Sequence, residues 1–322
     1  MIPSTRHLGG IMTSTQGNVL ARSFASAFGG TVLTRDDERY DSARAIWNGT
    51  VDGHPALIAR CHAAEDIAAA VNLTREAGLP LAVRGGGHSV AGLSTCDDGV
   101  VIDLSPMRGV SIDPVRRIAT VQPGATWADF DAAAAVNGLA TTGGLISSTG
   151  VAGLTLGGGI GWLQRKYGLS CDNLVAADLV TASRDFVHAS ETEHEGLLWG
   201  LRGGGGNFGI VSRFEFALHP VSIILGGLML FPLARGKEVL TALREWAVGA
   251  PDEASLLAAI STAPPEPFVP PELMGQKVLA IVGCWCGDLD AGTAALGPVA
   301  RARACRGPVR AYAIPGPADH AG

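Results

Sequence analysis

Short apolar runs and one amphipathic stretch follow one another between residues 50 and 84. Ala56–Cys61 is an apolar run of strand length. Apolar residues such as Ile67 and Val71 then recur at helical spacing until Gly78 ends the pattern. Leu81–Arg84 is the next apolar run, so the pattern predicts a β-α-β unit that leads into a glycine-rich loop.

Further strands and a second helix are predicted between residues 99 and 138. Thr126 and Asp129 have the spacing of a capping box, so a helix is expected over Ala128–Val136, with Asn137-Gly138 as its stop signal. The apolar runs predicted as strands are Gly99–Leu104, Val110–Ile112 and Ile118–Gln122.

The pattern changes after Val221 to longer apolar runs with proline-rich joints. Val278–Trp285 is predicted as a strand and Leu289–Leu296 as the start of a helix. From about residue 301 an Ala/Arg/Gly/Pro-rich tail shows no hydrophobic period. We therefore divide the chain into a polar N-terminal segment over 1–49, with a short helix near Val19–Phe28, a glycine-dense region over 50–220, and a last region over 221–322.

Composition narrows the class of protein. The 322 residues are 47% hydrophobic, and the net charge is −6 without large basic clusters. A nucleic-acid partner and a basic membrane-binding patch are therefore not expected. No apolar run reaches the roughly 20 residues of a transmembrane helix, and the N-terminus lacks the apolar core of a secretory signal. The six cysteines show neither CxxC pairs nor zinc-ligand spacing, so we expect reduced thiols, no metal site and a cytoplasmic location.

One glycine cluster has the spelling of a dinucleotide-binding turn. Residues 204–209 read Gly-Gly-Gly-Asn-Phe-Gly, which satisfies GxGxxG. That turn must follow a strand and open a helix, whereas here a predicted helix, Glu195–Leu201, precedes it and a predicted strand, Ile210–Phe216, follows. The context argues against NAD.

The segment Val83–Ser89 carries the most informative chemistry. Three consecutive glycines, residues 85–87, allow a tight bend with backbone N–H groups directed at an anion, and His88 follows them directly. By itself this pattern favours a histidine that caps the loop through hydrogen bonds, and a glycine-rich α+β domain for another phosphate ligand is a further alternative.

Five segments taken in order are far more specific. The chain carries Arg84–Ser89, Gly143–Gly153, Gly157–Leu169, Asp172-Asn173 and Arg202–Val211. This order resembles the FAD-binding domain of the vanillyl-alcohol oxidase, or PCMH-type, superfamily. Within it the chain is similar to the berberine bridge enzyme-like oxidoreductases, including 6-hydroxynicotine oxidase-type bacterial members.

The resemblance implies an α+β fold, with a two-subdomain FAD-binding domain followed by an incomplete, mostly antiparallel substrate-domain sheet with helices. It also implies that His88 bonds covalently to the flavin and that the glycine segments wrap the phosphates and the isoalloxazine. The implied cofactor-binding residues are Arg84, Gly85, Gly86, Gly87, His88, Ser89, Gly92, Gly144, Ser148, Thr149, Gly150, Gly153, Gly157, Gly158, Gly161, Asp172, Asn173, Ile210 and Val211.

Many relatives attach the flavin a second time through a cysteine in the middle glycine segment. Ile146 stands at that position here, so the resemblance implies a single covalent link. The implied activity is FAD-dependent oxidation of a small organic substrate, in which the flavin takes a hydride and O2 reoxidises it.

Other polar and aromatic residues have simpler interpretations. Trp162 and Tyr167 are expected to pack around the cofactor, and Asp131 is expected to be a helix-start charge. His188, His194 and His219 are expected to be ordinary surface histidines. Arg202 is equally consistent with a phosphate contact and with a helix-ending arginine.

The last region is shorter than the resemblance implies. Relatives continue through the rest of a substrate domain and return a C-terminal segment that often supplies the catalytic base. We therefore expect a chain that is truncated relative to its family, with a tail typical of a shifted reading frame, and we name no catalytic residue. The alternative function is a catalytically impaired flavin-binding remnant, or a product that does not fold stably.

Overall fold

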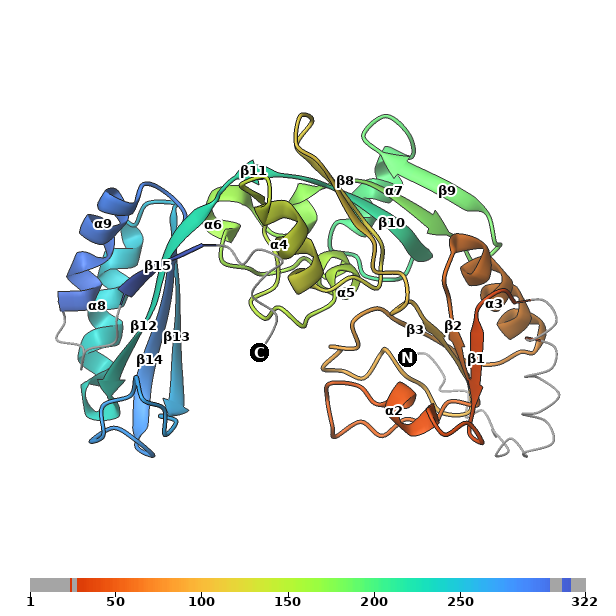
Figure 1. Ribbon diagram of the computed structural model, residues 1–322, viewed down its shortest axis with the longest axis horizontal. Coiled ribbons are helices and arrows are strands. Elements are labelled where there is room, and N and C mark those ends of the chain that lie inside the picture. Colours follow the sequence, from red (N-terminus) through yellow and green to blue (C-terminus); the bar gives the residue numbers. More distant parts are fainter. Residues whose placement is uncertain (1–23, 25–27, 302–308, 314–322) are drawn as a thin grey trace, which may run out of the picture.

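The computed structural model describes Phe24, residues 28–301 and residues 309–313. It has two α+β subdomains that lie side by side and a third region at the far end (Figure 1). Most of the helix expected near Val19–Phe28 lies outside the described residues. Phe24 and Phe28 are described, and both are buried in the first core.

The first subdomain is a four-stranded sheet in the order β1-β2-β4-β3, in which β2, β4 and β3 are parallel and β1 is antiparallel. Alternate residues of β2 face opposite sides, because successive side chains of a strand point to opposite faces. Leu57 and Ala59 pack towards α3, and Ile58 packs with Tyr40 of α2. The elements are β1 Thr31–Thr34, α2 Tyr40–Arg44, β2 Leu57–Arg60, α3 Ala64–Glu76, β3 Leu81–Arg84 and β4 Val100–Asp103.

The second subdomain is an antiparallel sheet in the order β5-β6-β10-β8-β9. Trp127 and Phe130 of α4 pack with Phe214 and Phe216 of β10 in a core from which solvent is excluded. The main elements are β5 Val110–Asp113, β6 Ile118–Val121, α4 Trp127–Ala135, β8 Leu174–Val180, β9 Phe186–Ser190, α7 Glu195–Leu201 and β10 Ile210–Ala217. Short elements complete it, namely β7 Leu139–Ala140, α5 Val151–Leu156, α6 Gln164–Tyr167, a 3-10 turn at Cys171–Asn173, and β11 His219–Pro220.

The third region is an antiparallel sheet in the order β13-β14-β12-β15. Its helices α8 and α9 lie together on one face of the sheet (Figure 1). Phe231, Val239 and Ile281 form part of the core between sheet and helices. The elements are β12 Ile223–Pro232, a 3-10 turn at Leu233–Arg235, α8 Gly236–Val248, β13 Ala254–Thr262, β14 Lys277–Trp285, α9 Leu289–Arg301 and β15 Val309–Ala313.

The tail departs from the sequence expectation. Its lack of a hydrophobic period predicted no element, yet Val309–Ala313 forms β15 and pairs with β12. Strands pair through backbone hydrogen bonds, which depend little on side-chain type. A strand that joins the edge of a sheet can therefore lack the alternation of apolar and polar residues from which strands are predicted.

Short α6 connects the second subdomain to the third region. Arg165 donates hydrogen bonds to the carbonyl oxygens of Ala250 (3.0 Å) and Ala254 (3.1 Å), and Lys166 lies 3.2 Å from the carboxylate of Glu253. These contacts come from two successive residues, and they fix the start of β13 against the second subdomain.

The described cysteines are free thiols, and most of them are buried. They are Cys61, Cys96, Cys171, Cys284 and Cys286. Burial raises the pKa of Cys96 to about 11 and that of Cys284 to about 12, so both are inert thiols at neutral pH. Among the described residues, no helix is long and apolar enough to span a membrane, and no cluster suits a metal ion.

Candidate functional site

The first two glycine segments touch each other. Gly86, in the loop after β3, and Gly150, at the start of α5, are so close that a Cβ on Gly150 would lie 2.5 Å from the Gly86 nitrogen. Real Cβ atoms do not approach a backbone atom so closely, so only glycine fits at either position. Two segments distant in the sequence therefore form one continuous backbone surface between the two subdomains.

Arg84 immediately precedes this loop, and its side chain is engaged within the protein. The guanidinium lies 2.8 Å from the carboxylate of buried Asp103 and donates to the carbonyl oxygen of Ala43. Asp103 also accepts from the Ser105 N–H at 3.1 Å. The Arg84 side chain thus fixes the strand ends from which the loop departs, and the implied cofactor contact of Arg84 stays a prediction.

A cavity of about 480 Å³ opens beside the loop, at the carboxyl ends of the parallel strands. Strand carboxyl ends with an adjacent glycine loop are a common place for anionic ligands, because backbone N–H groups remain free there. Four arginines, including Arg84, and Thr126 contribute polar groups to the cavity wall. Asp103 is the one carboxylate among the residues that line the cavity. The lining residues are Leu33, Arg39, Ser42, Ala43, Ala45, Ile46, Trp47, Arg60, Arg84, Gly85, Gly86, Gly87, Asp103, Ser105, Arg108, Gly124 and Thr126.

His88 lies between two segments that are far apart in the sequence. Its Nε2 is 3.3 Å from the Ser148 hydroxyl of the second glycine segment. Its imidazole also stacks on the Trp47 indole, with ring centroids 5.5 Å apart and planes at 18°. The structure thus brings together His88 and Ser148, which were predicted, with Trp47, which was not.

The rest of the first loop is held locally. The Ser89 hydroxyl accepts a hydrogen bond from the Leu93 N–H at 3.0 Å, and the Ser89 carbonyl accepts from the Gly92 N–H at 3.2 Å. Gly92 has a φ of +78°, a conformation that glycine adopts without strain. Ser89 and Gly92 therefore form a tight turn, and a direct contact with a cofactor stays a prediction.

The second glycine segment runs along the start of α4. Ser147 and Thr149 accept hydrogen bonds through their carbonyls from the Ala128 and Trp127 N–H groups, and Val151 donates to Ala125. The predicted capping box stands at the N-terminus of α4, where the Asp129 carboxylate accepts a hydrogen bond from the Thr126 N–H. Asp129 also forms an ion pair with Arg108 at 2.7 Å. Burial opposes ionisation of Asp129, but these hydrogen bonds lower its pKa below the ordinary value.

Three buried polar atoms in this part of the chain lack a hydrogen-bond partner. They are Trp127 Nε1, Thr141 Oγ1 and Thr142 Oγ1, on side chains with at most 3% exposure. A Cβ on Gly144 would lie 3.2 Å from Trp127 Nε1, which places that donor beside the second glycine segment. Unsatisfied buried groups are costly, so this cluster is suited to a polar ligand or bound water.

The third glycine segment is explained largely by contacts within the protein. A Cβ on Gly161 would overlap the Gly143 carbonyl oxygen, and the Gly158 carbonyl accepts a hydrogen bond from the Cys171 N–H at 2.9 Å. Gly157 ends α5, and Gly153 within α5 has open space where a Cβ would lie. The expectation that these glycines allow packing against the isoalloxazine stays a prediction, whereas their close contacts with the chain are observed.

The Asn173 side chain makes three hydrogen-bonding contacts within the protein. Its amide donates to the carbonyls of Tyr167 (2.9 Å) and Leu169 (2.8 Å), and its Oδ1 lies 2.7 Å from His219 Nε2. Exposed Asp172 accepts from the Leu169 N–H at 2.8 Å. These two residues form a 3-10 turn, and the expected strand begins after it, at Leu174. The implied cofactor contact of Asp172 and Asn173 stays a prediction, whereas the hydrogen bonds of the Asn173 side chain within the protein are observed.

His219 is not an ordinary surface residue, contrary to expectation. Its ring stacks on Tyr167 with centroids 3.9 Å apart and planes at 13°. Burial lowers the pKa of His219 below its ordinary value, and nearby Arg117 adds to this effect. Its neighbour Leu218 is a buried core residue, which is the sequence signal that could have placed His219 inside.

The remaining predicted residues also serve packing. Ile210 and Val211 are buried in different subdomain cores, and their contact with adenine stays a prediction. Arg202 donates two hydrogen bonds to the Leu174 carbonyl, at 2.9 and 2.7 Å. These bonds favour the interpretation of Arg202 as a helix-ending arginine over a phosphate contact. His188 pairs with Asp178 at 2.6 Å.

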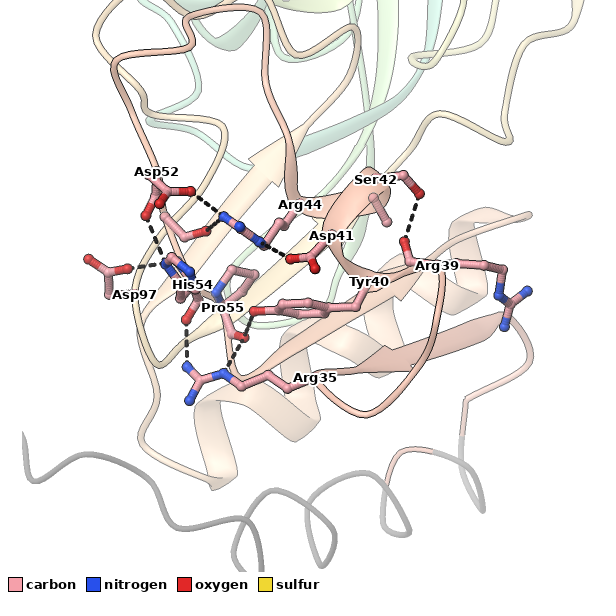
Figure 2. Close-up of polar contacts among 12 residues, drawn as sticks. Arg35, Arg39, Tyr40, Asp41, Ser42, Arg44, Asp52, His54, Pro55 and Asp97 are labelled. Atoms are coloured by element: carbon pink, nitrogen blue, oxygen red, sulfur yellow. Dashed lines mark hydrogen bonds and ion pairs between the residues drawn. The ribbon is translucent and has the colours of Figure 1, made fainter.

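A polar network around α2, absent from the sequence prediction, fixes the segment that carries Trp47. Figure 2 shows the Tyr40 hydroxyl and Arg35 converging on the Pro55 carbonyl, at 2.6 and 3.3 Å. Arg44 pairs with both Asp41 and Asp52 in the same view. The segment is therefore tied to the strand that follows it.

Comparisons with known proteins identify an FAD-binding domain in this part of the chain. Residues 55–190 match the family model described as FAD binding domain. The chain is 40% identical over 190 residues to (R)-6-hydroxynicotine oxidase of Paenarthrobacter nicotinovorans, covering 59% of the chain and 42% of that protein. An FAD-linked oxidoreductase of Dictyostelium discoideum is 35% identical over 246 residues, covering 76% of the chain and 54% of that protein.

Solved structures give the same result. The 6-hydroxy-D-nicotine oxidase of Arthrobacter nicotinovorans superposes with a TM-score of 0.81 at 30% identity, covering 89% of this chain and 62% of that one. A glucooligosaccharide oxidase of Acremonium strictum, whose structure is described as revealing a novel flavinylation, gives 0.77 at 30% identity, covering 92% and 60%.

Fold, glycine segments and matched residues together define a flavoprotein with an FAD-binding domain. The chain is similar to FAD-linked oxidoreductases over this domain, and a berberine bridge enzyme-like protein shares its fold. It spans about half the length of the curated relatives that it matches.

Proposed function

We propose that this protein is an oxidase-type FAD-dependent oxidoreductase that holds its flavin covalently through His88 and acts on a small organic substrate. The observation that carries the proposal is the contact of Gly86 with Gly150, which joins the loop bearing His88 to the segment bearing Ser148. A single cofactor can reach both segments only because they are adjacent.

The residues present fit FAD. The backbone N–H groups of residues 85–87 and Gly150 would face the pyrophosphate, since N–H groups in such a loop suit an anion. Arg39, Arg60 and Arg108 lie in the cavity wall, and each is paired with a carboxylate of the chain, Asp37, Asp103 and Asp129 respectively. Unpaired Trp127 Nε1, Thr141 and Thr142 offer polar partners along the second segment.

When bound, FAD supplies two-electron redox chemistry and accepts a hydride from a C–H bond next to oxygen or nitrogen. The protein's contribution is to bind, orient and shield. Ile146 is 61% exposed where many relatives carry a second attachment cysteine, and its side chain forms no covalent bond. We therefore expect one attachment per chain. Molecular oxygen is the proposed oxidant.

The attachment is tested by His88→Ala. Purified protein is denatured, separated on a gel and examined for flavin fluorescence, with His62→Ala as a matched control because His62 is exposed and outside the site. A fluorescent wild-type and control band that is absent in His88→Ala supports the covalent link. A dark wild-type band from yellow protein would restrict the proposal to noncovalent FAD, and colourless soluble protein would overturn it.

The reaction is tested separately by anaerobic mixing of the flavin-loaded protein with small amines and alcohols. Bleaching of the flavin absorbance, followed by recovery and peroxide formation on admitting air, supports an oxidase. Stable flavin that no substrate bleaches would favour the alternative of a catalytically impaired remnant.

A further inference from the structure

Two consecutive residues, Trp47 and Asn48, surround His88 from a distant part of the sequence. The Trp47 N–H donates to the Gly87 carbonyl at 3.1 Å, and the Asn48 side-chain amide donates to the Val90 carbonyl at 2.7 Å. The Trp47 indole covers one face of the imidazole. The backbone is therefore held on both sides of His88, and the ring itself is stacked.

The segment that bears Trp47 is fixed to the same glycine loop at a second place. Arg84, the residue before the loop, donates to the carbonyl of Ala43 and approaches that of Ala45 at 3.5 Å. The Asn48 side-chain oxygen Oδ1 in turn accepts from the Thr50 N–H and hydroxyl at 3.1 and 2.8 Å. Segment 43–50 and loop 84–90 thus form a small rigid unit with His88 near its centre.

Burial does not account for Trp47. The indole remains 66% exposed, whereas the core tryptophan Trp127 is fully buried. The hydrophobic gain of placing Trp47 here is therefore small, because it scales with the apolar area removed from water. Among the residues that the structure describes, its aromatic ring contact is with His88.

We infer that Trp47, supported by Asn48, is a positioning residue for His88 in the attachment of the flavin. The inference rests on the proposed covalent link. Attachment joins an imidazole nitrogen to the 8α methyl carbon of the flavin, with loss of the imidazole proton and one methyl hydrogen, while O2 takes up the two electrons and both hydrogens as peroxide. Such a reaction depends on alignment, so an imidazole that turns freely reacts more slowly.

The test follows attachment in time. The whole chain, purified from riboflavin-limited cells, is mixed with FAD in air, and flavin fluorescence of the denatured band is read at intervals. Noncovalent binding is measured in parallel by quenching of free FAD fluorescence. Trp47→Ala removes the stack, Trp47→Phe retains an aromatic face, and Trp199→Ala is the matched control because Trp199 is 79% exposed on α7.

We expect Trp47→Ala to attach flavin roughly tenfold more slowly than wild type when both are saturated with FAD, since orientation effects of this size follow from small misalignments. Trp47→Phe should stay within about threefold of wild type and Trp199→Ala should be indistinguishable from it. Attachment by Trp47→Ala at the wild-type rate would overturn the inference while leaving the proposed function intact. A wild type that binds FAD without attaching it would overturn both the inference and the covalent link.

A second measurement needs no cofactor. In the apoprotein with 13C-labelled histidine, the ring-current field of a stacked indole should move the His88 ring protons upfield in wild type and Trp47→Phe. Trp47→Ala should lose that displacement. Identical His88 resonances in wild type and Trp47→Ala would show that the rings are not stacked in solution and would overturn the inference. If Trp47→Ala fails to fold, Asn48→Ala takes its place, with several-fold slower attachment expected and unchanged attachment contradicting the inference.

Discussion

Gly86 and Gly150 lie in backbone contact, each occupying the space where the other's Cβ would be. One belongs to the loop after a parallel strand of the first subdomain, and the other precedes a helix of the second. The contact closes the gap between the subdomains at one point, and the candidate cofactor site extends to both sides of it.

Gly150→Ala should therefore lower both stability and flavin content. The added methyl would lie 2.5 Å from the Gly86 nitrogen, and neither backbone can retreat without separating the subdomains. We expect a loss of about 2 kcal/mol, typical of overpacking, measured by urea unfolding. Gly153→Ala is the control, since open space surrounds its Cβ position and alanine favours the helix by about 0.5–1 kcal/mol. Equal stability of both variants would contradict the contact.

Asp103→Asn should be strongly destabilising. Asp103 is 1% exposed and faces Arg84 at 2.8 Å and Arg60 at 3.3 Å, so neutralising it leaves buried positive charge without compensation. Losses of about 3–5 kcal/mol are usual when one partner of a buried pair is removed. Asp41→Asn is the matched control, because Asp41 pairs with Arg44 while 84% exposed and should change stability by less than about 1 kcal/mol. The free energy of unfolding of both variants is measured by chemical denaturation. Equal losses in the two variants would contradict the prediction.

Arg165→Ala should weaken the contact between the third region and the second subdomain. The substitution removes hydrogen bonds to the carbonyls of Ala250 and Ala254, at the start of β13. Hydrogen exchange of amides in β13 should accelerate several-fold, while amides of the five-stranded sheet keep wild-type protection. Arg116→Ala, on the turn between β5 and β6, provides a control. Unchanged exchange in β13 would mean that other contacts hold the junction.

Asp131 makes stability depend on pH. Burial raises its pKa from 3.8 to about 7. Between these values the folded protein retains a proton that the unfolded chain has released, so stability falls as pH rises from about 4 to 7. The full shift corresponds to about 4 kcal/mol, and residual contact with solvent reduces this to roughly half. Asp131→Asn should remove this part of the pH dependence, measured as melting temperature against pH. Parallel curves for both proteins would contradict the assignment. Helix α4 begins at Trp127 and the acidic residue of its first turn is Asp129, so the expectation that Asp131 is a helix-start charge is corrected.

The local sequence pattern was sufficient to predict most helices and strands. Strand Leu81–Arg84 and helix α7 were predicted with their observed bounds, and α3 and α4 lie where helical spacing and a capping box put them. These features depend on residues within a few positions of one another, which is why the linear sequence reports them. The glycine segments were likewise visible, since tight turns and close approaches require glycine wherever they occur.

Residues far apart in the sequence were brought together only by the tertiary structure. Arg84 faces Asp103 because their strands are parallel neighbours, and Trp47 meets His88 because the segment after α2 folds back over the loop. Asn173 and His219 are joined across a connection between subdomains. The sequence by itself determined the β-α-β start and the place of His88 in a glycine loop, because those rest on local residue types and spacing. The FAD-binding class followed from the resemblance of five segments, taken in order, to a known family. Long-range packing decided which side chains surround His88. It also decided which predicted residues make hydrogen bonds within the protein, and no local pattern encodes such packing.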